Sequence, residues 1–129
     1  QQTGEDLFLD SNPNVVSAHM ESGFTWNTQD QELDKKLANE TWLEAEKFLA
    51  DPSINLVVLD EITYMINYKY LDETSILKAL GNRPEGQHVV ITGRAASDGI
   101  IEASDTVSEV KDVKHAFRAN IRAQKGIDL

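Results

Sequence analysis

Two short apolar runs separated by a helical segment constrain the fold more than any other feature of this sequence. These runs, LVVL at residues 56–59 and HVVIT at residues 88–92, are too short for helices and rich in strand-forming residues. A continuous apolar run is typical of a strand buried on both faces of a sheet. Because helices join such strands through right-handed crossovers, the sheet is parallel. The sequence therefore predicts an α/β fold, with a mainly parallel sheet and flanking helices.

A long helix is predicted before the first of these strands. Thr28 and Gln31 have the spacing of a capping box, which satisfies backbone N–H groups at a helix start. Apolar residues then recur at steps of three and four up to Leu49, which places them on one helical face. The helix is expected to end at residues 51–52, Asp-Pro, because proline cannot continue it.

Three shorter helices are predicted after the first strand. One covers residues 62–68, directly beyond the strand. A second begins at Asp72, which is a good N-cap residue, and closes at Gly81. Ser97 caps the third, which includes residues 100–101.

Further strands are predicted from valine-containing segments at residues 15–16 and 105–110. The second of them would give a βαβαβ-like order, in which ligands bind beyond the carboxyl ends of the strands. With 129 residues, 40% of them hydrophobic and 26% charged, the chain is expected to form a single domain over residues 1–129.

Charge and composition exclude several classes of function. The 12 Lys and Arg residues against 22 Asp and Glu residues leave a formal net charge of −10, which argues against binding to nucleic acid or an anionic membrane. The absence of cysteine excludes disulfides, thiolate zinc sites and thiol catalysis. No apolar run approaches the ~20 residues of a membrane span, and no secretory leader is recognisable, so a cytoplasmic location is expected.

The first strand runs directly into two acidic residues, Asp60 and Glu61. The resulting LVVLDE has the form of a Walker B strand, whose carboxylates hold Mg²⁺ on nucleotide phosphates. A buried strand that ends in Asp is also common in α/β proteins that bind no metal. The companion phosphate loop, GxxxxGK[ST], is absent from the 129 residues. From this run alone both interpretations stay open.

Two other segments are candidates for ligand binding. Phe24 and Trp26 flank one residue, so in an extended segment they form a flat apolar platform that suits a large planar ligand or covers the sheet edge. Basic residues gather towards the C-terminus, with Lys114, His115 and Arg118 among them. They can neutralise phosphate or carboxylate groups of a ligand, or they form a solvated basic face.

Four blocks, taken in order, resemble one family of enzymes. The blocks are GFTWNTQD, LVVLDEITYMINYKYL, HVVITGR and VKHAFRANIRAQKGIDL. They resemble the ATP:corrinoid adenosyltransferases of the bacterial type that act on cob(I)alamin or cob(I)yrinic acid a,c-diamide. The resemblance runs from about Gly23 to Leu129. It implies a P-loop NTPase-like (RecA-like) fold that is incomplete at the N-terminus, with this chain as the C-terminal two-thirds and the phosphate loop upstream of Gln1.

The resemblance also implies a reaction. The family transfers the 5′-deoxyadenosyl group of ATP to the Co(I) of a corrinoid and releases triphosphate, in adenosylcobalamin biosynthesis. Phe24 and Trp26 match aromatic residues that lie against the corrinoid and exclude an axial ligand, which eases reduction of the cobalt. Asp60 and Glu61 match the acidic strand end, where the implied role is Mg²⁺ binding to the triphosphate.

Further residues and partners follow from the same resemblance. The residues expected near the nucleotide are Thr63, Tyr64 and Asn67. The residues expected to contact anionic groups or corrinoid side chains are Arg94, Lys114, His115 and Arg118. Family members commonly act as homodimers, and a reduced flavoprotein is the implied electron donor. Without the phosphate loop, the chain alone is expected to be inactive, and loss of the first strand is expected to uncover apolar surface on the sheet.

Two other functions stay open at this point. A P-loop ATPase or kinase remnant would share the acidic strand end but would not need the aromatic platform. A non-catalytic α/β binding module would bind a corrinoid or a partner without turnover. Replacing Trp26 by Ala separates adenosyl transfer from simple binding, because only the reaction depends on excluding the axial ligand.

Overall fold

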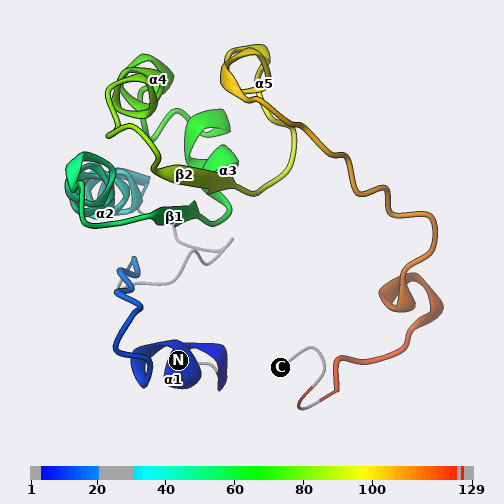
Figure 1. Ribbon diagram of the computed structural model, residues 1–129. Coiled ribbons are helices and arrows are strands. Elements are labelled where there is room, and N and C mark those ends of the chain that lie inside the picture. The colour runs from blue at the N-terminus through cyan, green and yellow to red at the C-terminus, as the bar shows by residue number, and fades with distance from the viewer. Residues whose placement is uncertain (1–3, 21–30, 125, 127–129) are drawn as a thin grey trace. The chain divides into compact units, whose positions relative to one another are not determined.

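The structure is a computed structural model that describes residues 4–20, 31–124 and 126. Contacts between residues divide the chain into two units, one formed by residues 17–105 and the other by residues 1–16 with residues 106–129. The first unit contains both strands and most of the helices (Figure 1). No helix in the described part of the chain is long and apolar enough to cross a membrane.

The two described strands form a parallel pair. β1 (Leu56–Leu59) and β2 (His88–Ile91) are in register from their first residues to their last, where Leu59 lies opposite Ile91. The connection between them contains α3 (Ile62–Asn67) and α4 (Glu73–Gly81), as a parallel crossover requires (Figure 1). The α/β class, both strands and both helices are therefore confirmed.

Burial on the sheet is one-sided. Val57 and Leu59 are buried, whereas Leu56 and Val58 are 54% and 55% exposed. Val90 on β2 is exposed in the same way, at 46%. The prediction that these strands are buried on both faces is wrong for the described residues, because their core packs against one face of the pair. Apolar surface, as expected on the sheet, is exposed on the other face at Leu56, Val58 and Val90.

α2 (Gln31–Ala50) supplies a long apolar stripe to this core. Ala38, Trp42 and Leu49 are buried, at the spacing that the sequence predicts. The helix contacts β1 and α4. Its end at Ala50, just before Asp51-Pro52, agrees with the prediction, whereas the predicted capping box at its start includes Thr28, which lies outside the described residues.

One buried amide connects the end of α2 to the start of β2. Gln87 is 5% exposed, and its Nε2 donates to the carbonyl oxygens of Phe48 (3.1 Å), Asp51 (3.2 Å) and Ile54 (3.0 Å). Carbonyl groups at a helix end lack helical partners and need other donors. The Gln87 side chain supplies these donors at the α2–β1 turn.

The shorter helices begin at the predicted caps. Asp72 accepts hydrogen bonds from the Ser75 backbone N (3.0 Å) and Oγ (2.9 Å) at the start of α4. Ser97 accepts from the Ile100 backbone N (3.3 Å) at the start of α5 (Asp98–Ala103). The Ser97 hydroxyl also donates to Glu73 Oε1 (2.6 Å), which fixes α5 to α4.

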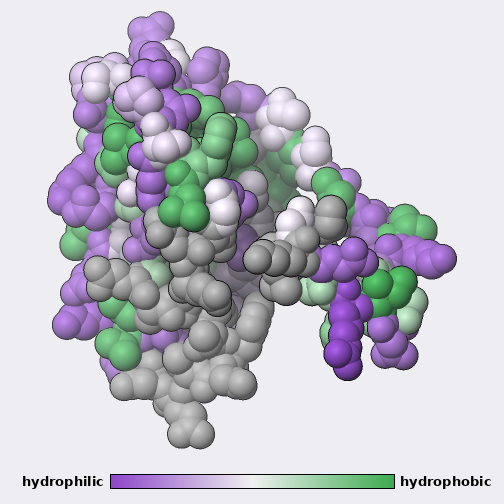
Figure 2. Space-filling view, turned by 90° about the horizontal axis from the view of Figure 1, so that it is seen from below, coloured by the Kyte–Doolittle hydropathy of each residue, from purple (hydrophilic) through white to green (hydrophobic). Residues whose placement is uncertain are grey.

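The second unit carries little buried surface. Its elements among the described residues are α1 (Gly4–Asp10) and the short 3-10 helix η1 (Ala116–Ala119), and neither buries a residue. The predicted strands at residues 15–16 and 105–110 are not formed. Val110 is 97% exposed, and a strand without a hydrogen-bonded neighbour has no ladder to stabilise it. In Figure 2, hydrophilic residues prevail over the described surface in view, in line with a mean hydropathy of −0.40.

Candidate functional site

The carboxyl ends of β1 and β2 form the candidate site. Asp60 and Glu61 follow β1, and Thr92 and Gly93 follow β2. The Thr92 backbone N donates to the Leu59 carbonyl oxygen (3.1 Å), so the parallel pairing continues one residue past β2. The register of the two strands therefore places Thr92 beside the acidic pair.

The Thr92 hydroxyl contacts both acidic residues. Its Oγ1 donates to Asp60 Oδ1 and accepts the Glu61 backbone N–H, at an N···O distance of 2.9 Å. Both acidic residues are exposed. Within the described part of the chain, Asp60 Oδ2 and the carboxylate of Glu61 have no hydrogen-bond or ion-pair partner. Three carboxylate oxygens are thus available to a ligand at this end of the sheet.

Glu61 has an unusual backbone conformation. Its φ of 54° is in the left-handed region, and it is the N-cap of α3 without a capping bond from its side chain. A residue with a Cβ atom costs about 1–2 kcal/mol in this conformation. The strand therefore turns abruptly into α3, and the Glu61 carboxylate is not used to cap the helix.

Gly93 packs tightly against α3. Its φ is +140°, and a Cβ atom at this position would lie 1.9 Å from Oγ1 of Thr63. Thr63 is 3% exposed, and its hydroxyl has no hydrogen-bond partner among the described residues. Only glycine allows the segment after β2 to approach α3 this closely.

Asn67 fixes the continuation of that segment. Its Nδ2 donates to the carbonyl oxygens of Arg94 (3.3 Å) and Ala95 (3.2 Å). Ala95 has a φ of 51°, so the chain turns there in a left-handed conformation. Tyr64, on the same helix as Asn67, stacks on Tyr68 with 6.5 Å between the ring centroids.

The structure thus brings six predicted residues to the β1–α3 junction and the segment that packs against α3. They are Asp60, Glu61, Thr63, Tyr64, Asn67 and Arg94.

The other predicted residues are not part of this group. Phe24 and Trp26 lie outside the described residues. Lys114, His115 and Arg118 belong to the second unit and are exposed.

The predicted basic residues in the second unit make local contacts. The His115 Nδ1 accepts the Phe117 backbone N–H (3.1 Å) as the N-cap of η1. Arg118 forms an ion pair with Asp112, six residues earlier in the chain. Both contacts are made within η1 or with the segment just before it. Lys114, which lies in that segment, is exposed.

The acidic pair has the donor chemistry that Mg²⁺ requires. In the described ranges, no three His, Cys, Asp or Glu side chains come close enough to hold a metal ion together. Mg²⁺ on a nucleotide does not need such a cage, since one or two carboxylates with phosphate and water oxygens complete its coordination. The free oxygens of Asp60 and Glu61 fit that arrangement.

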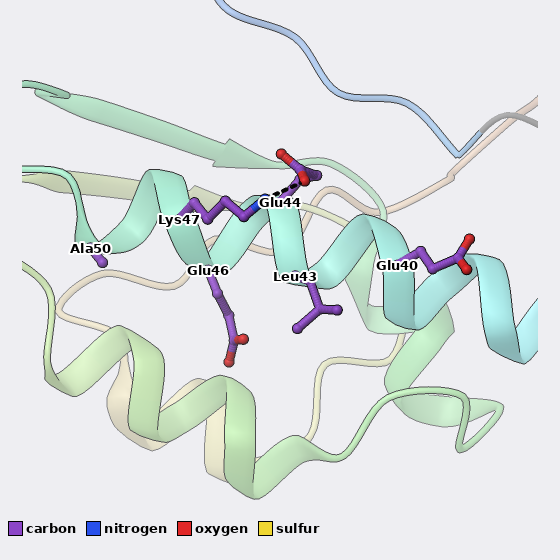
Figure 3. Close-up of a pocket in the computed structure, with 6 residues that line it drawn as sticks. All are labelled: Glu40, Leu43, Glu44, Glu46, Lys47 and Ala50. Carbon is purple, nitrogen blue, oxygen red and sulfur yellow. Dashed lines mark hydrogen bonds and ion pairs between the residues drawn. The ribbon is translucent and has the colours of Figure 1, made fainter.

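A separate depression of about 580 Å³ lies on α2 (Figure 3). Its lining residues are Glu40, Leu43, Glu44, Glu46, Lys47 and Ala50. Lys47 pairs with Glu44 at 2.6 Å, and none of the predicted site residues contributes to the lining. The depression is therefore not part of the strand-end site.

Two site residues carry no role in the sequence prediction. Thr92 and Gly93 stand in the block HVVITGR, but nothing in that block alone relates them to Asp60 or Thr63. The available signal is positional, because a polar residue directly after the second of two parallel strands lies beside the end of the first.

Comparison with known proteins identifies relatives of the whole chain. Residues 1–129 match the family model described as ATP:corrinoid adenosyltransferase BtuR/CobO/CobP. A corrinoid adenosyltransferase of Pseudomonas aeruginosa is 49% identical over 128 residues, which cover 98% of this chain and 63% of the relative. One from Escherichia coli K12 is 50% identical over 109 residues, or 84% of this chain and 56% of the relative. Corrinoid adenosyltransferase CobA of Salmonella typhimurium is 48% identical over the same coverage of 84% and 56%. The chain thus spans 56–63% of the length of these curated relatives.

Proposed function

The chain belongs to the ATP:corrinoid adenosyltransferase family, and from this premise we propose that it serves in adenosyl transfer to a corrinoid. The 5′-deoxyadenosyl group of ATP passes to the Co(I) of cobalamin or cob(I)yrinic acid a,c-diamide, and triphosphate leaves. The observation that carries the proposal is the family match over all 129 residues. Since the chain spans 63% of the Pseudomonas relative, the activity is proposed for this chain together with the part of the relative that it does not match.

Asp60 and Glu61 hold the metal of the nucleotide in this proposal. Asp60 Oδ2 and the Glu61 carboxylate, which have no partner among the described residues, stand at the carboxyl end of β1, where ligands of parallel sheets bind. Mg²⁺ bound there offsets the negative charge that develops on the departing triphosphate. The Thr92 hydroxyl keeps one Asp60 oxygen directed at the strand end and leaves the other available.

The residues around the acidic pair bind the nucleotide. The buried contact of Thr63 with Gly93 and the bonds from Asn67 to the carbonyl groups of residues 94 and 95 support a rigid segment beside the acidic pair. Arg94 is carried by that segment and is exposed, so its guanidinium can pair with an anionic group. Tyr64 contributes its ring from α3.

Corrinoid binding is assigned to the remaining predicted residues. Phe24 and Trp26 lie against the corrinoid and keep water and other axial ligands from the cobalt, which eases reduction to Co(I). Lys114, His115 and Arg118 contact anionic groups of the ligands. Lys114 is an exposed cation, and Arg118 is an exposed cation paired with Asp112, so both can attract an anionic group locally in a chain of net charge −10.

The proposal includes the larger protein. The parallel β1–β2 pair, its helical crossover and the acidic residues at its end support a P-loop NTPase-like (RecA-like) fold. Residues 1–129 would form the C-terminal two-thirds of one such domain, with the phosphate loop upstream of Gln1. Assembly as a homodimer, a reduced flavoprotein as electron donor and a cytoplasmic location belong to the same proposal.

An adenosylation assay tests the function. Cob(II)alamin, a chemical reductant and MgATP are mixed with the chain alone, or with a chimera in which the unmatched part of the Pseudomonas relative precedes Gln1. The visible spectrum then reports formation of the cobalt–carbon bond. We expect product from the chimera and none from the chain alone. ATP consumption without adenosylcobalamin, or no reaction in either sample, would overturn the proposal in favour of another nucleotide-binding or non-catalytic function.

Substitutions in the chimera separate the two halves of the site. Glu61→Gln removes the carboxylate and keeps the size of the side chain. If Glu61 holds Mg²⁺, the rate is expected to fall by about 10²-fold or more. Trp26→Ala removes half of the platform and is expected to lower the rate with cob(II)alamin. Thr41→Val on α2 is the matched control, because it removes a hydroxyl bonded to the Leu37 carbonyl oxygen (2.9 Å) and none of the proposed site.

A further inference from the structure

A single hydroxyl connects the ends of the two strands. Thr92 makes three hydrogen bonds to three consecutive residues: its backbone N donates to Leu59, its hydroxyl donates to Asp60, and its hydroxyl accepts from Glu61. A hydroxyl has one hydrogen to donate and two lone pairs to accept with. The donor and acceptor functions of the Thr92 side chain are therefore both used on the acidic pair.

The bond to Glu61 meets a specific need of the backbone. α3 begins at Ile62, three residues after β1 ends at Leu59, and Glu61 turns the chain with a φ of 54°. N–H groups at the start of a helix have no helical carbonyl oxygen to bind. The Thr92 hydroxyl satisfies the Glu61 N–H and thereby holds the residue in its left-handed conformation.

We propose that Thr92 is the positioning residue of the acidic pair: its hydroxyl sets the Asp60 carboxylate and the Glu61 backbone in the arrangement that receives Mg²⁺ on the triphosphate. This inference rests on the proposed function. Thr92 does not touch the reacting atoms. It acts through Asp60 and Glu61, whose remaining oxygens it leaves available.

The neighbouring residue reinforces the same junction. Gly93 approaches Thr63 so closely that the end of β2 and the start of α3 are in direct contact one residue beyond Thr92. The Thr92 hydroxyl therefore joins two segments that packing already holds together. A hydroxyl held by rigid backbone segments fixes both the position and the orientation of the carboxylate that it binds. A metal site made of two carboxylates requires both.

Three variants separate positioning from general stability. Thr92→Val keeps the branched shape and the strand preference but can neither donate nor accept at this position. Thr92→Ser keeps the hydroxyl. Thr41→Val makes the same chemical change on α2, where the lost bond is to a carbonyl oxygen of the same helix. If Thr92→Val does not fold, Thr92→Ala provides the same comparison with a smaller side chain.

Two readouts are needed. The first is the exchange rate of the Glu61 amide hydrogen in the 129-residue chain, measured by NMR, which reports the Thr92 bond whether or not the chain is active. The second is the Mg²⁺ concentration for half-maximal adenosylation by the chimera. We expect Thr92→Val to raise both the exchange rate and the half-saturating Mg²⁺ by roughly tenfold, with Thr92→Ser within about twofold of the wild type and Thr41→Val unchanged in both.

Other results overturn the inference. Unchanged exchange at Glu61 in Thr92→Val means that the hydroxyl does not hold this backbone. Faster exchange with an unchanged Mg²⁺ requirement means that Thr92 is structural only, as does an equal effect of Thr41→Val. If the wild-type chimera forms no adenosylcobalamin, the proposed function fails and the role of Thr92 in Mg²⁺ binding fails with it. The Glu61 exchange rate then decides only whether the Thr92 hydroxyl holds the Glu61 backbone.

Discussion

The region from β1 to α5 and the region beyond Ser104 differ in what holds their polar side chains. In the first region, Thr92 bonds to Glu61 across 31 residues of sequence and Asn67 bonds to Ala95 across 28. In the second, Arg118 pairs with Asp112 across six residues, and every described residue is exposed. Both regions contain residues predicted to bind ligands, but only in the first are they fixed by bonds between distant elements.

The difference follows from burial. The residues that make polar contacts at the strand ends are next to buried residues. Leu59, Ile62 and Thr63 are 7%, 7% and 3% exposed. Fixing a residue in one conformation costs about 1–2 kcal/mol of backbone entropy, which apolar burial offsets in a packed region. Beyond Ser104 no comparable burial is present among the described residues, and the bonds of His115, Arg118 and Ile121 reach at most six residues along the chain. Four sets of substitutions test this contrast, from the largest expected effect to the smallest.

The sharpest test compares a buried and an exposed aliphatic residue. Ile76 on α4 is 0% exposed and Val110 is 97% exposed. Ile76→Ala is expected to lower the free energy of unfolding by about 4 kcal/mol, because it removes buried methyl groups and leaves a cavity. Val110→Ala is expected to change it by less than about 0.5 kcal/mol. Urea denaturation measures both, and similar losses at the two positions would contradict the contrast.

A glycine pair tests the close approach at the site. Gly93→Ala is expected to destabilise the chain by about 2–3 kcal/mol, because the new Cβ meets Thr63 and the backbone has a positive φ. Gly86 is the control, since its φ is also positive, at +81°, but no atom lies within 4 Å of an added Cβ. Gly86→Ala is expected to lose only about 1 kcal/mol. Equal losses would show that Thr63 does not oppose the added methyl group.

The cap of α4 has a pH-dependent contribution. Hydrogen bonds from the Ser75 hydroxyl and, second, its backbone N–H lower the pKa of Asp72 below its usual 3.8. The folded state therefore binds this proton less readily than the unfolded state. The stabilisation is complete above pH 3.8 and is lost as the pH falls through the lowered pKa.

Asp72→Ala is expected to lower the thermal midpoint at neutral pH by less than Gly93→Ala does. The same substitution should make little difference at a pH below the pKa of the folded state. Ser75→Ala, which removes only the hydroxyl donor, should raise the pKa of Asp72 towards 3.8 in an NMR titration. A pKa that does not move would refute the cause assigned to it.

The smallest effect is expected at the exposed ion pair. The Arg118 and Asp112 side chains are 63% and 45% exposed. Exposed pairs contribute little, because solvent and salt screen them. Arg118→Gln is expected to change the free energy of unfolding by less than about 0.5 kcal/mol, and this difference should shrink further in 1 M salt. A loss as large as that of Gly93→Ala would mean that the second unit is held more firmly than its exposure indicates.

Local signals account for the parts of the fold that could be predicted. Asp72 with Ser75 and Ser97 with Ile100 are contacts within three residues, so the cap pattern is visible in the sequence itself. The strands at residues 56–59 and 88–91 are recognisable as short apolar runs. Residues 105–110 contain two valines and a threonine, which favour a strand, but a strand also needs a hydrogen-bonded neighbour, which composition does not reveal. α1 was not predicted, because Leu7, Phe8 and Leu9 are consecutive and have no helical spacing.

The site could be predicted only in part for the same reason. Asp60 and Glu61 stand out because they end an apolar run. The roles of Thr92 and Gly93 depend on the register between β1 and β2 and on the packing of α3, and neither run contains that information by itself. Phe24 and Trp26 stand out in the sequence as an aromatic pair, and the basic residues of the second unit as a cluster. The family resemblance supplied their roles, which stay predictions.

Gln87 limits which sequences this arrangement tolerates. The two hydrogens of its amide nitrogen are shared among three carbonyl oxygens in a buried position between the end of α2 and the start of β2. Glutamate has nearly the same shape but would place an acceptor against three acceptors, and leucine would leave all three carbonyl groups without this donor. Asparagine has the right group on a shorter stem. Position 87 should therefore accept few replacements in any functional variant library, although no motif marks it and it lies at the opposite end of β2 from the proposed chemistry.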